Sequence, residues 1–398
     1  MIAVEDVAFL RSRHGAKALE NAAALELTPS TLIADLAELR SRYGSRAPAL
    51  VETVRCRRRA VGRLRDPEHW LLTDVALQQA TAGVVAARRA AEIAARFSGA
   101  VVHDVTCSIG AELVELADNG GIGAIIGSDL DPVRLAMAAH NVTGATLLRA
   151  DALTPTSTAD VLIADPARRS SSGTRSFRPD DFSPPLLDVL TTYAGRPLAV
   201  KTAPGIDYGT LRARYGFDGQ VQITSLDGGV REACLWTELD DGVRQRATVL
   251  RVVEGALRVE EVTDLESDDV GVGPAGTWIV DPDGAIVRAG LVRHWAHRHG
   301  LWQLDPKIAY LTGDAVPPGE RGFAVLEQLP LKEKMLRKAL ASRDCGSLEI
   351  LVRGVDVDPD ELRKRLRLKG STPLAMVVTR IGTRAVAFLC EPGWRRPA

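Results

Sequence analysis

Cysteine is scarce in this sequence, and its spacing is the first informative feature. Five cysteines are spread over 398 residues without any Cys-x-x-Cys pair: Cys56, Cys107, Cys234, Cys345 and Cys390. Such spacing is not typical of zinc ribbons or disulfide frameworks, and it fits a reducing compartment. We therefore expect a cytoplasmic protein that requires no metal.

Long apolar runs and a large net charge are also missing. No stretch has the length that a bilayer-spanning helix needs, so no membrane partner is expected, and the formal net charge is only −1. This balance predicts no strong overall attraction to polyanions. Arginines nevertheless gather at residues 55–65, 168–178 and 363–367, so the net charge does not exclude local basic patches that contact nucleic acid.

The length exceeds what one hydrophobic core usually serves, so several domains are expected. Residues 1–69 are predicted to form a helical N-terminal domain, and residues 70–240 an α/β domain. Residues 241–321 are predicted to form a β-rich connecting region. Residues 322–398 follow the order strand, helix, strand, helix and two strands, which indicates a small α+β domain.

Strand and helix patterns alternate in the α/β domain. One long Ala-rich helix is expected over residues 73–97, followed by four short apolar strands and then a fifth at residues 196–204. Such alternation predicts a parallel sheet with right-handed crossovers. Residues 221–239 place two apolar runs around Asp227-Gly228-Gly229, which suits a hairpin.

Each of four successive strands ends at an acidic residue. These residues are Asp104, Asp129, Asp151 and Asp165. Ligands of open α/β sheets bind at the carboxyl ends of the strands, so the four acids should lie along one binding edge. Asp129 stands where a carboxylate accepts the ribose hydroxyls of a nucleoside cofactor. The glycines at 120, 121 and 123 precede a strand, so they do not form a dinucleotide fingerprint.

Four motifs carry a family resemblance. DVTCSIGA (104–111), GSDLDPVRLAMAAHNV (127–142), RADA (149–152) and IADPARR (163–169) stand at successive strand ends. Together they resemble the motifs of class I S-adenosylmethionine-dependent methyltransferases, particularly those that modify RNA bases. The resemblance implies a Rossmann-like fold, with a seven-stranded sheet whose last hairpin is antiparallel, and S-adenosyl-L-methionine as the cofactor.

The resemblance assigns the cofactor-binding residues by position. Asp104, Cys107 and Gly110 would line the methionine end of the cofactor. The ribose would lie at Asp129 and the adjoining Leu130, and the adenine at Asp151 and Ala152.

The catalytic motif would be Asp165-Pro166-Ala167-Arg168, facing the methyl-accepting atom. The family usually has a second proline and an aromatic residue where this chain has Ala167 and Arg168, and usually a glycine at Ser108. Asp165 retains the acceptor oxygens that orient a planar amino group.

A polar segment follows the catalytic motif. Arg169, Arg175 and Phe177 interleave cations with an aromatic ring, which suits contact with phosphate and stacking on a base, and Lys201 could join them. A solvated loop explains the same residues equally well. We predict these four residues as substrate-binding.

The C-terminal α+β unit resembles the THUMP-like domain that follows some actinobacterial methyltransferases. THUMP domains generally present RNA to a modifying domain, so a base nitrogen of RNA is the expected acceptor. The basic run at residues 363–369 either binds RNA or forms surface ion pairs. Three alternatives stay open: an inactive protein that binds the cofactor and RNA, a small-molecule or protein methyltransferase, and a nicotinamide-binding protein.

Overall fold

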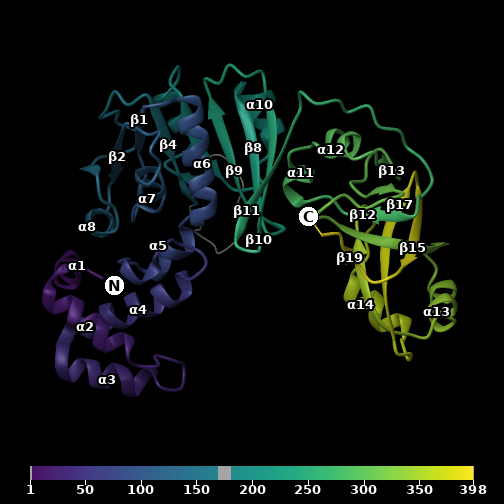
Figure 1. The fold of residues 1–398 in the computed structure, drawn as a ribbon, viewed down its shortest axis with the longest axis horizontal. Coiled ribbons are helices and arrows are strands. Elements are labelled where there is room, and N and C mark those ends of the chain that lie inside the picture. Colours follow the sequence, from purple (N-terminus) through teal and green to yellow (C-terminus); the bar gives the residue numbers. More distant parts are fainter. Residues whose placement is uncertain (1, 169–180, 398) are drawn as a thin grey trace. The chain divides into compact units, whose positions relative to one another are not determined.

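The computed structural model describes residues 2–168 and 181–397 (Figure 1). The chain divides into two compact units, and each is described separately below. Unit 1 comprises Met1–Gln220 and Glu232–Asp240, and unit 2 comprises Val221–Arg231 and Asp241–Ala398.

Unit 1 begins with four helices, as the sequence predicts. They are α1 (Val4–Arg11), α2 (Arg13–Ala23), α3 (Leu32–Tyr43) and α4 (Ala47–Ala60). Their buried leucines share one apolar cluster with Trp70, Leu71 and Leu72 and with Met137 further along the chain. The helical region therefore shares its core with the residues that lead into the α/β sheet.

The basic last turn of α4 cross-links this region. Arg58 donates to the carbonyl oxygens of Ala23 (3.0 Å) and Leu25 (2.6 Å), where α2 has ended. Arg57 donates to the Trp70 carbonyl at 2.7 Å. Guanidinium groups used in this way satisfy backbone acceptors that would otherwise lack partners, so they support the fold.

The prediction of a single long helix over residues 73–97 is wrong. The structure has two helices there, α5 (Asp74–Gln79) and α6 (Gly83–Arg96). Arg63 explains the break, because its side chain donates to the Ala80 carbonyl at 2.6 Å and its own carbonyl accepts from the Gly83 amide at 2.7 Å. These tertiary hydrogen bonds replace the helical ones, which residue propensity alone does not reveal.

The sheet of unit 1 carries the predicted parallel order. Its strands are β1 (Val101–Asp104), β2 (Ala124–Asp129), β3 (Ala145–Arg149), β4 (Val161–Ala164), β7 (Leu198–Thr202) and β9 (Gly229–Thr237). The spatial order is β3-β2-β1-β4-β7-β9, parallel except for β9, which runs antiparallel to β7. The crossovers are made by α7 (Ala111–Ala117), α8 (Pro132–Asn141), α9 (Leu186–Thr192) and α10 (Tyr208–Tyr215).

The expected hairpin joins β8 (Gln220–Leu226) to β9. Its two turn residues, Asp227 (φ +51°) and Gly228 (φ +79°), both adopt the left-handed conformation that a tight hairpin of this type requires. The division between the two units falls within this hairpin. The antiparallel β9 agrees with the predicted fold class, but in the described part of the chain the sheet has nine strands instead of the seven expected, because two strands of unit 2 extend it beyond β8.

Unit 2 continues from β8. β10 (Gln245–Val253) runs parallel to β8, and β11 (Ala256–Thr263) pairs antiparallel with β10. Two short helices follow, α11 (Gly284–Arg288) and α12 (Val292–Arg298). No helix in the described ranges has the length and apolar character needed to cross a membrane.

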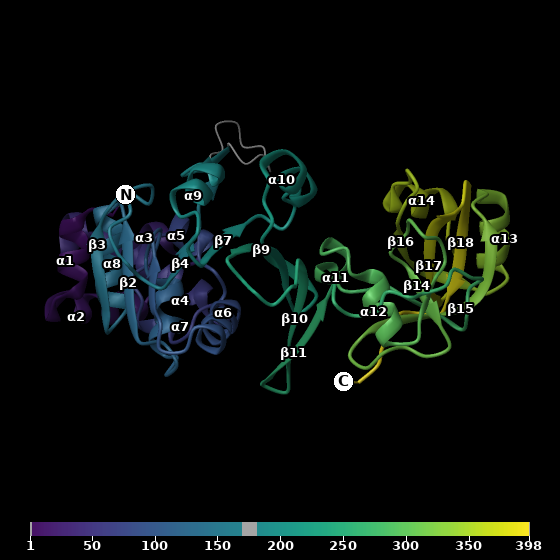
Figure 2. The same ribbon diagram turned by 90° about the horizontal axis from the view of Figure 1, so that it is seen from above.

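The C-terminal elements of unit 2 follow the predicted order (Figure 2). They are β15 (Arg321–Pro330), α13 (Glu333–Ala341), β16 (Cys345–Val352), α14 (Pro359–Leu366), β17 (Thr372–Ile381) and β18 (Arg384–Cys390). Leu336 of α13 and Leu362 of α14 share an apolar cluster with Met376 of β17. Three strands of the connecting region, β12 (Trp278–Val280), β13 (Trp302–Gln303) and β14 (Leu311–Gly313), belong to the same sheet.

Candidate functional site

The carboxyl ends of the parallel strands bring the predicted acids to one edge. Asp104 ends β1, Asp129 ends β2, and Asp165 directly follows β4. Because β1 lies between β2 and β4 with parallel pairing on both sides, these three residues lie at the same edge of the sheet. Asp151 follows β3, the strand beside β2. The spatial row that the sequence predicts is therefore present.

The loop after β1 connects these acids. The Thr106 amide donates to Asp104 Oδ1 at 3.0 Å, and the Thr106 hydroxyl accepts from the Asp165 amide at 2.6 Å. The Ser108 amide donates to Asp129 Oδ2 at 3.0 Å, and the Asp131 amide donates to Asp129 Oδ1 at 2.9 Å. The amides of the loop thus hold the carboxylates of Asp104 and Asp129, and the Thr106 hydroxyl holds the backbone of Asp165.

Two residues of this loop have left-handed backbone conformations. Ser108 has φ +50°, which explains why the resembling family places a glycine there. Gly110 has φ +86°, and a Cβ atom on it would lie 2.5 Å from Val142 Cγ2. The serine therefore carries a local strain, and the glycine leaves space for the packed side chain of Val142.

Asp104 is a buried carboxylate, with 3% of its surface exposed. Burial raises the pKa of Asp104 to about 7, although the Thr106 amide and the charge of Lys201 oppose this shift. Among the described residues, no cationic side chain lies within ion-pair distance of it. A buried acid without a cationic partner is suited to a cationic ligand group.

Cys107 lies beside Asp104 in the loop and is 3% exposed. Burial raises the pKa of the Cys107 thiol, and the charges of Asp104 and Asp129 raise it further. The thiol is therefore neutral at physiological pH, and its amide donates to the Ser128 carbonyl at 2.8 Å. Cys107 contributes shape to the loop rather than nucleophilic chemistry.

The edge next to Asp129 combines an exposed apolar residue with fixed polar ones. Leu130 is 59% exposed. Asp131 caps α8 by accepting from the Val133 amide at 2.8 Å. Asp151 is exposed, whereas Ala152 is buried and its carbonyl accepts from the Tyr193 hydroxyl at 2.7 Å.

Asn141, at the end of α8, holds the loop against the preceding segment. Its Oδ1 accepts from the Leu71 amide at 2.8 Å, and its Nδ2 donates to the carbonyls of Leu71 (3.1 Å) and Ile109 (2.9 Å). Sequence reasoning gave this residue no role. The asparagine within the motif that ends at Val142 was the available signal.

A chain of alternating charges leads to Asp165 from inside unit 1. Glu232 binds Arg89 (2.6 Å), Arg89 binds Glu112 (2.7 Å), Glu112 binds Lys201 (3.2 Å), and Lys201 binds Asp165 (2.5 Å). The first four side chains are at most 9% exposed, whereas that of Asp165 is 40% exposed. The chain therefore begins in the core and ends at the binding edge.

The neighbouring charges determine the ionisation of Glu112 and Lys201 in this row of ion pairs. Burial alone would raise the pKa of Glu112, but Arg89 and Lys201 lower it to about 2. Burial alone would lower the pKa of Lys201, but Asp165 and Glu112 hold it above its ordinary value. Both groups are therefore charged at physiological pH.

The placement of Lys201 differs from the sequence expectation. Lys201 was expected beside the arginines as a contact for phosphate, but its ammonium group is buried between two carboxylates. The acids satisfy its charge internally, which disfavours a phosphate contact. Sequence reasoning missed Arg89, Glu112 and Glu232, because their partners come from distant parts of the chain.

The remaining predicted residues lie around the loop after Asp165. Pro166 is buried, and β5 (Ala167–Arg168) pairs antiparallel with β6 (Phe182–Ser183). Arg169, Arg175 and Phe177 lie outside the described residues. Among the residues that are described, no cluster of three or more metal-ligating side chains occurs.

Comparison with known proteins identifies the family. Two proteins of Mycobacterium tuberculosis, from strains CDC 1551 and H37Rv, are each 52% identical over 370 residues, covering 89% of this chain and 99% of the relative. Both are named uncharacterized S-adenosylmethionine-dependent methyltransferases. The chain belongs to the S-adenosylmethionine-dependent methyltransferase family. It is thus a transferase that uses S-adenosyl-L-methionine.

Further comparisons agree with the fold and the C-terminal domain. Residues 320–392 match the family described as THUMP domain-like, and residues 3–60 match a domain of unknown function, DUF8688. A crystal structure of a candidate methyltransferase from Porphyromonas gingivalis W83 has a TM-score of 0.71 at 18% identity, covering 97% of this chain and 98% of that one. The expected resemblance to methyltransferases with a THUMP-like C-terminus is confirmed.

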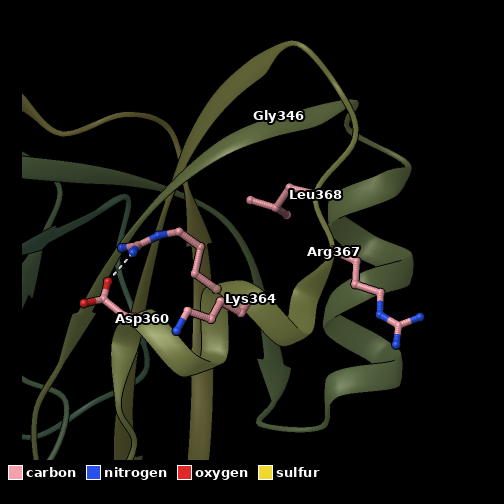
Figure 3. Close-up of a pocket in the computed structure, with 6 residues that line it drawn as sticks. Gly346, Asp360, Lys364, Arg367 and Leu368 are labelled. Atoms are coloured by element: carbon pink, nitrogen blue, oxygen red, sulfur yellow. Dashed lines mark hydrogen bonds and ion pairs between the residues drawn. The ribbon is translucent and has the colours of Figure 1, made fainter.

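The THUMP-like region contains a hollow of about 560 Å³ beside α14 (Figure 3). Arg363 binds Asp360 at 2.5 Å, and Lys364 binds Glu361 at 2.7 Å. Arg365 likewise binds Glu333, at 3.2 Å. The surface ion pairs considered for this basic run therefore form at all three positions.

Arg367 and Lys369, at the end of the same run, are exposed and have no acidic partner among the described residues. Arg367 lines the hollow, and Figure 3 shows its side chain extended away from the other labelled residues. These two cations remain available to a ligand.

Proposed function

We propose that the chain transfers the methyl group of S-adenosyl-L-methionine to a base nitrogen of RNA, with Asp165 orienting the acceptor. The observation that carries this proposal is the position of Asp165. Its partly exposed carboxylate ends the buried charge chain at the binding edge, directly before Pro166 and Ala167. A carboxylate held there accepts a hydrogen bond from an amino group and fixes its direction.

The residues at the edge fit the cofactor in both charge and shape. The buried carboxylate of Asp104 would face its ammonium group, and Asp129 would hold its ribose. Exposed Leu130 offers apolar surface for the adenine, and Asp151 and Ala152 lie beside it. Cys107 and Gly110 would complete the methionine end. When bound, the cofactor supplies an electrophilic methyl group on its sulfonium sulfur.

Asp165 would act on the acceptor rather than on the cofactor. Lys201 occupies its Oδ2 at 2.5 Å, and within the described part of the chain Oδ1 has no partner. Oδ1 would accept a hydrogen bond from the acceptor nitrogen and so align the nitrogen lone pair with the methyl group. Pro166 and Arg168 would lie beside the base, with Arg169, Arg175 and Phe177 as further RNA contacts.

The C-terminal domain supports RNA as the acceptor. The THUMP-like match covers residues 320–392, and the hollow beside α14 is bordered by Arg367. Arginine side chains free of intramolecular acids are suited to phosphate oxygens. We propose that this surface binds RNA and that the protein acts in the cytoplasm, where its five free cysteines remain reduced.

Radiolabelled cofactor tests the acceptor class. The full-length protein is incubated with total RNA from a strain that lacks this gene, and the RNA is digested to nucleosides for analysis. Label in one modified nucleoside supports the proposal. Label only in protein or small-molecule fractions assigns a different acceptor, and saturable cofactor binding without any transfer indicates an inactive binding protein.

Two alanine variants separate binding from transfer. Asp129→Ala should lower the affinity for the cofactor by about tenfold, because the variant loses a charge-assisted hydrogen bond of roughly 1.5 kcal/mol. Asp165→Ala should leave cofactor affinity within twofold of the wild-type value and reduce transfer roughly a hundredfold. Calorimetry measures binding, and the labelled-RNA assay measures transfer. Full activity of Asp165→Ala would discredit the assigned site.

A charge reversal tests the RNA surface. Arg367→Glu should weaken RNA binding severalfold and flatten its dependence on salt, because a phosphate contact is lost. Arg384→Glu, at an exposed site that does not line the hollow, is the matched control. Filter binding at several salt concentrations measures both variants. If the two charge reversals weaken RNA binding equally, the hollow is not part of the RNA-binding surface.

A further inference from the structure

The lysine at the end of β7 lies where it controls the geometry of Asp165. Lys201 Nζ is 2.5 Å from Asp165 Oδ2 and 3.2 Å from Glu112 Oε2. Lys201 is 7% exposed, so the ammonium group has little access to solvent. A buried side chain with two carboxylate partners has few alternative conformations, and it therefore restrains the more exposed of the two partners.

Asp165 is the more exposed partner. Its side chain is 40% exposed, whereas that of Glu112 is 4% exposed and is also bound by Arg89 at 2.7 Å. Glu112 would keep a cationic partner without Lys201. Asp165 would keep none, because in the described ranges Lys201 is the only cation within ion-pair distance of it.

The charges of these five ion-paired residues sum to one negative charge, which lies at Asp165. Glu232 and Glu112 are acids, and Arg89 and Lys201 are cations, so the four buried groups sum to zero. Asp165 adds a single negative charge at the exposed end. An acceptor amine gains positive charge as its bond to the methyl group forms, so an anion at that place favours the transition state.

We infer that Lys201, supported by Glu112 and Arg89, is a positioning residue that fixes Asp165 through Oδ2 and so directs Oδ1 toward the acceptor nitrogen. The inference rests on the proposed function, because it assigns Asp165 to the acceptor. Lys201 touches neither substrate nor cofactor in this assignment. Its effect on the acceptor passes through Asp165, which distinguishes it from a general structural residue.

Matched substitutions test the inference in the full-length protein. Lys201→Met keeps the length of the side chain but removes its charge, and it should lower kcat for RNA methylation roughly ten- to a hundredfold. The charge of Lys201 also lowers the pKa of Asp104, so cofactor binding is compared at a pH well above 7, where Asp104 is ionised in both proteins. There the KM for the cofactor and its calorimetric affinity should stay within twofold. Lys201→Arg should recover most of the loss. Lys17→Met removes an exposed ion pair with Glu20 and should change neither quantity.

A double-mutant cycle gives the sharper criterion. If Lys201 acts through Asp165, Lys201→Met should cause no further loss of kcat in an Asp165→Asn background. Additive losses would overturn the inference, as would an equal loss of cofactor affinity in Lys201→Met.

Crystal structures of Lys201→Met and Lys201→Arg supply a measurement that needs no acceptor. The Asp165 carboxylate should leave its wild-type rotamer in the first variant and keep it in the second. If the wild-type protein methylates no RNA, the proposed acceptor fails while this comparison still decides the role of Lys201. An unchanged rotamer in Lys201→Met would refute it.

Discussion

At pH 8 the Asp104→Asn variant should be more stable to denaturant than the wild-type protein and should bind the cofactor more weakly. Burial raises the pKa of Asp104 from 3.8 to about 7. Between these values the unfolded chain releases a proton that the folded protein retains, so stability falls as the pH rises and the cost is complete above pH 7. At about 1.4 kcal/mol per pKa unit, that cost reaches up to ~4 kcal/mol.

Asparagine removes the cost because it carries no charge, and its Oδ1 still accepts from the Thr106 amide. The gain in stability should therefore be large at pH 8 and vanish at about pH 3, below the unfolded value of 3.8, where Asp104 is protonated in both states. Unfolding by urea at these two pH values measures it. If the wild-type protein and Asp104→Asn are equally stable at pH 8, burial of the Asp104 carboxylate does not destabilise the folded protein.

The same charge governs the expected affinity for the cofactor. In the wild-type protein, binding should weaken as the pH falls below about 7, because a neutral Asp104 no longer attracts an ammonium group. In Asp104→Asn the affinity should be at least tenfold lower at pH 8 and should lose this pH dependence. Calorimetry across the pH range distinguishes both effects. Such a trade of stability for binding is common at functional sites.

The sequence contains most of the information about the binding edge, because the edge depends on strand order. The periodicity of residues 100–166 identifies the parallel strands, and the acids that end them must then lie side by side. Asp104, Asp129 and Asp165 were placed correctly for this reason. The hairpin turn at Asp227-Gly228 was equally visible, since few residue pairs adopt two successive left-handed conformations.

Tertiary partners explain what the sequence does not reveal. Arg89 belongs to an Ala-rich helix, and nothing local indicates that Glu112 and Glu232, 23 and 143 residues away, bind it. The break between α5 and α6 likewise depends on hydrogen bonds from Arg63. The strands β10 and β11 resemble ordinary strands in sequence, and their pairing beside β8 emerges only from the fold.

Replacing Arg89 should destabilise the protein more than replacing any surface arginine. Arg89 is 4% exposed and binds Glu112 at 2.7 Å and Glu232 at 2.6 Å. Arg89→Met leaves Glu232 buried without its cation and leaves Glu112 with Lys201 alone. Removing one member of a buried ion pair typically costs about 3–5 kcal/mol, because the remaining charge is desolvated without compensation.

Denaturant unfolding against two further variants tests this explanation. Arg42→Met makes the same substitution in an exposed ion pair with Glu38 and should cost less than about 1 kcal/mol. The double variant Arg89→Met/Glu232→Met removes one charge of each sign and should recover much of the loss, because Glu112 keeps Lys201 and no unpaired acid remains. A loss that is equal in Arg89→Met and Arg42→Met contradicts the buried charge chain. A double variant no more stable than Arg89→Met would instead attribute the loss to packing, and Lys201 would then hold Asp165 without support from the core.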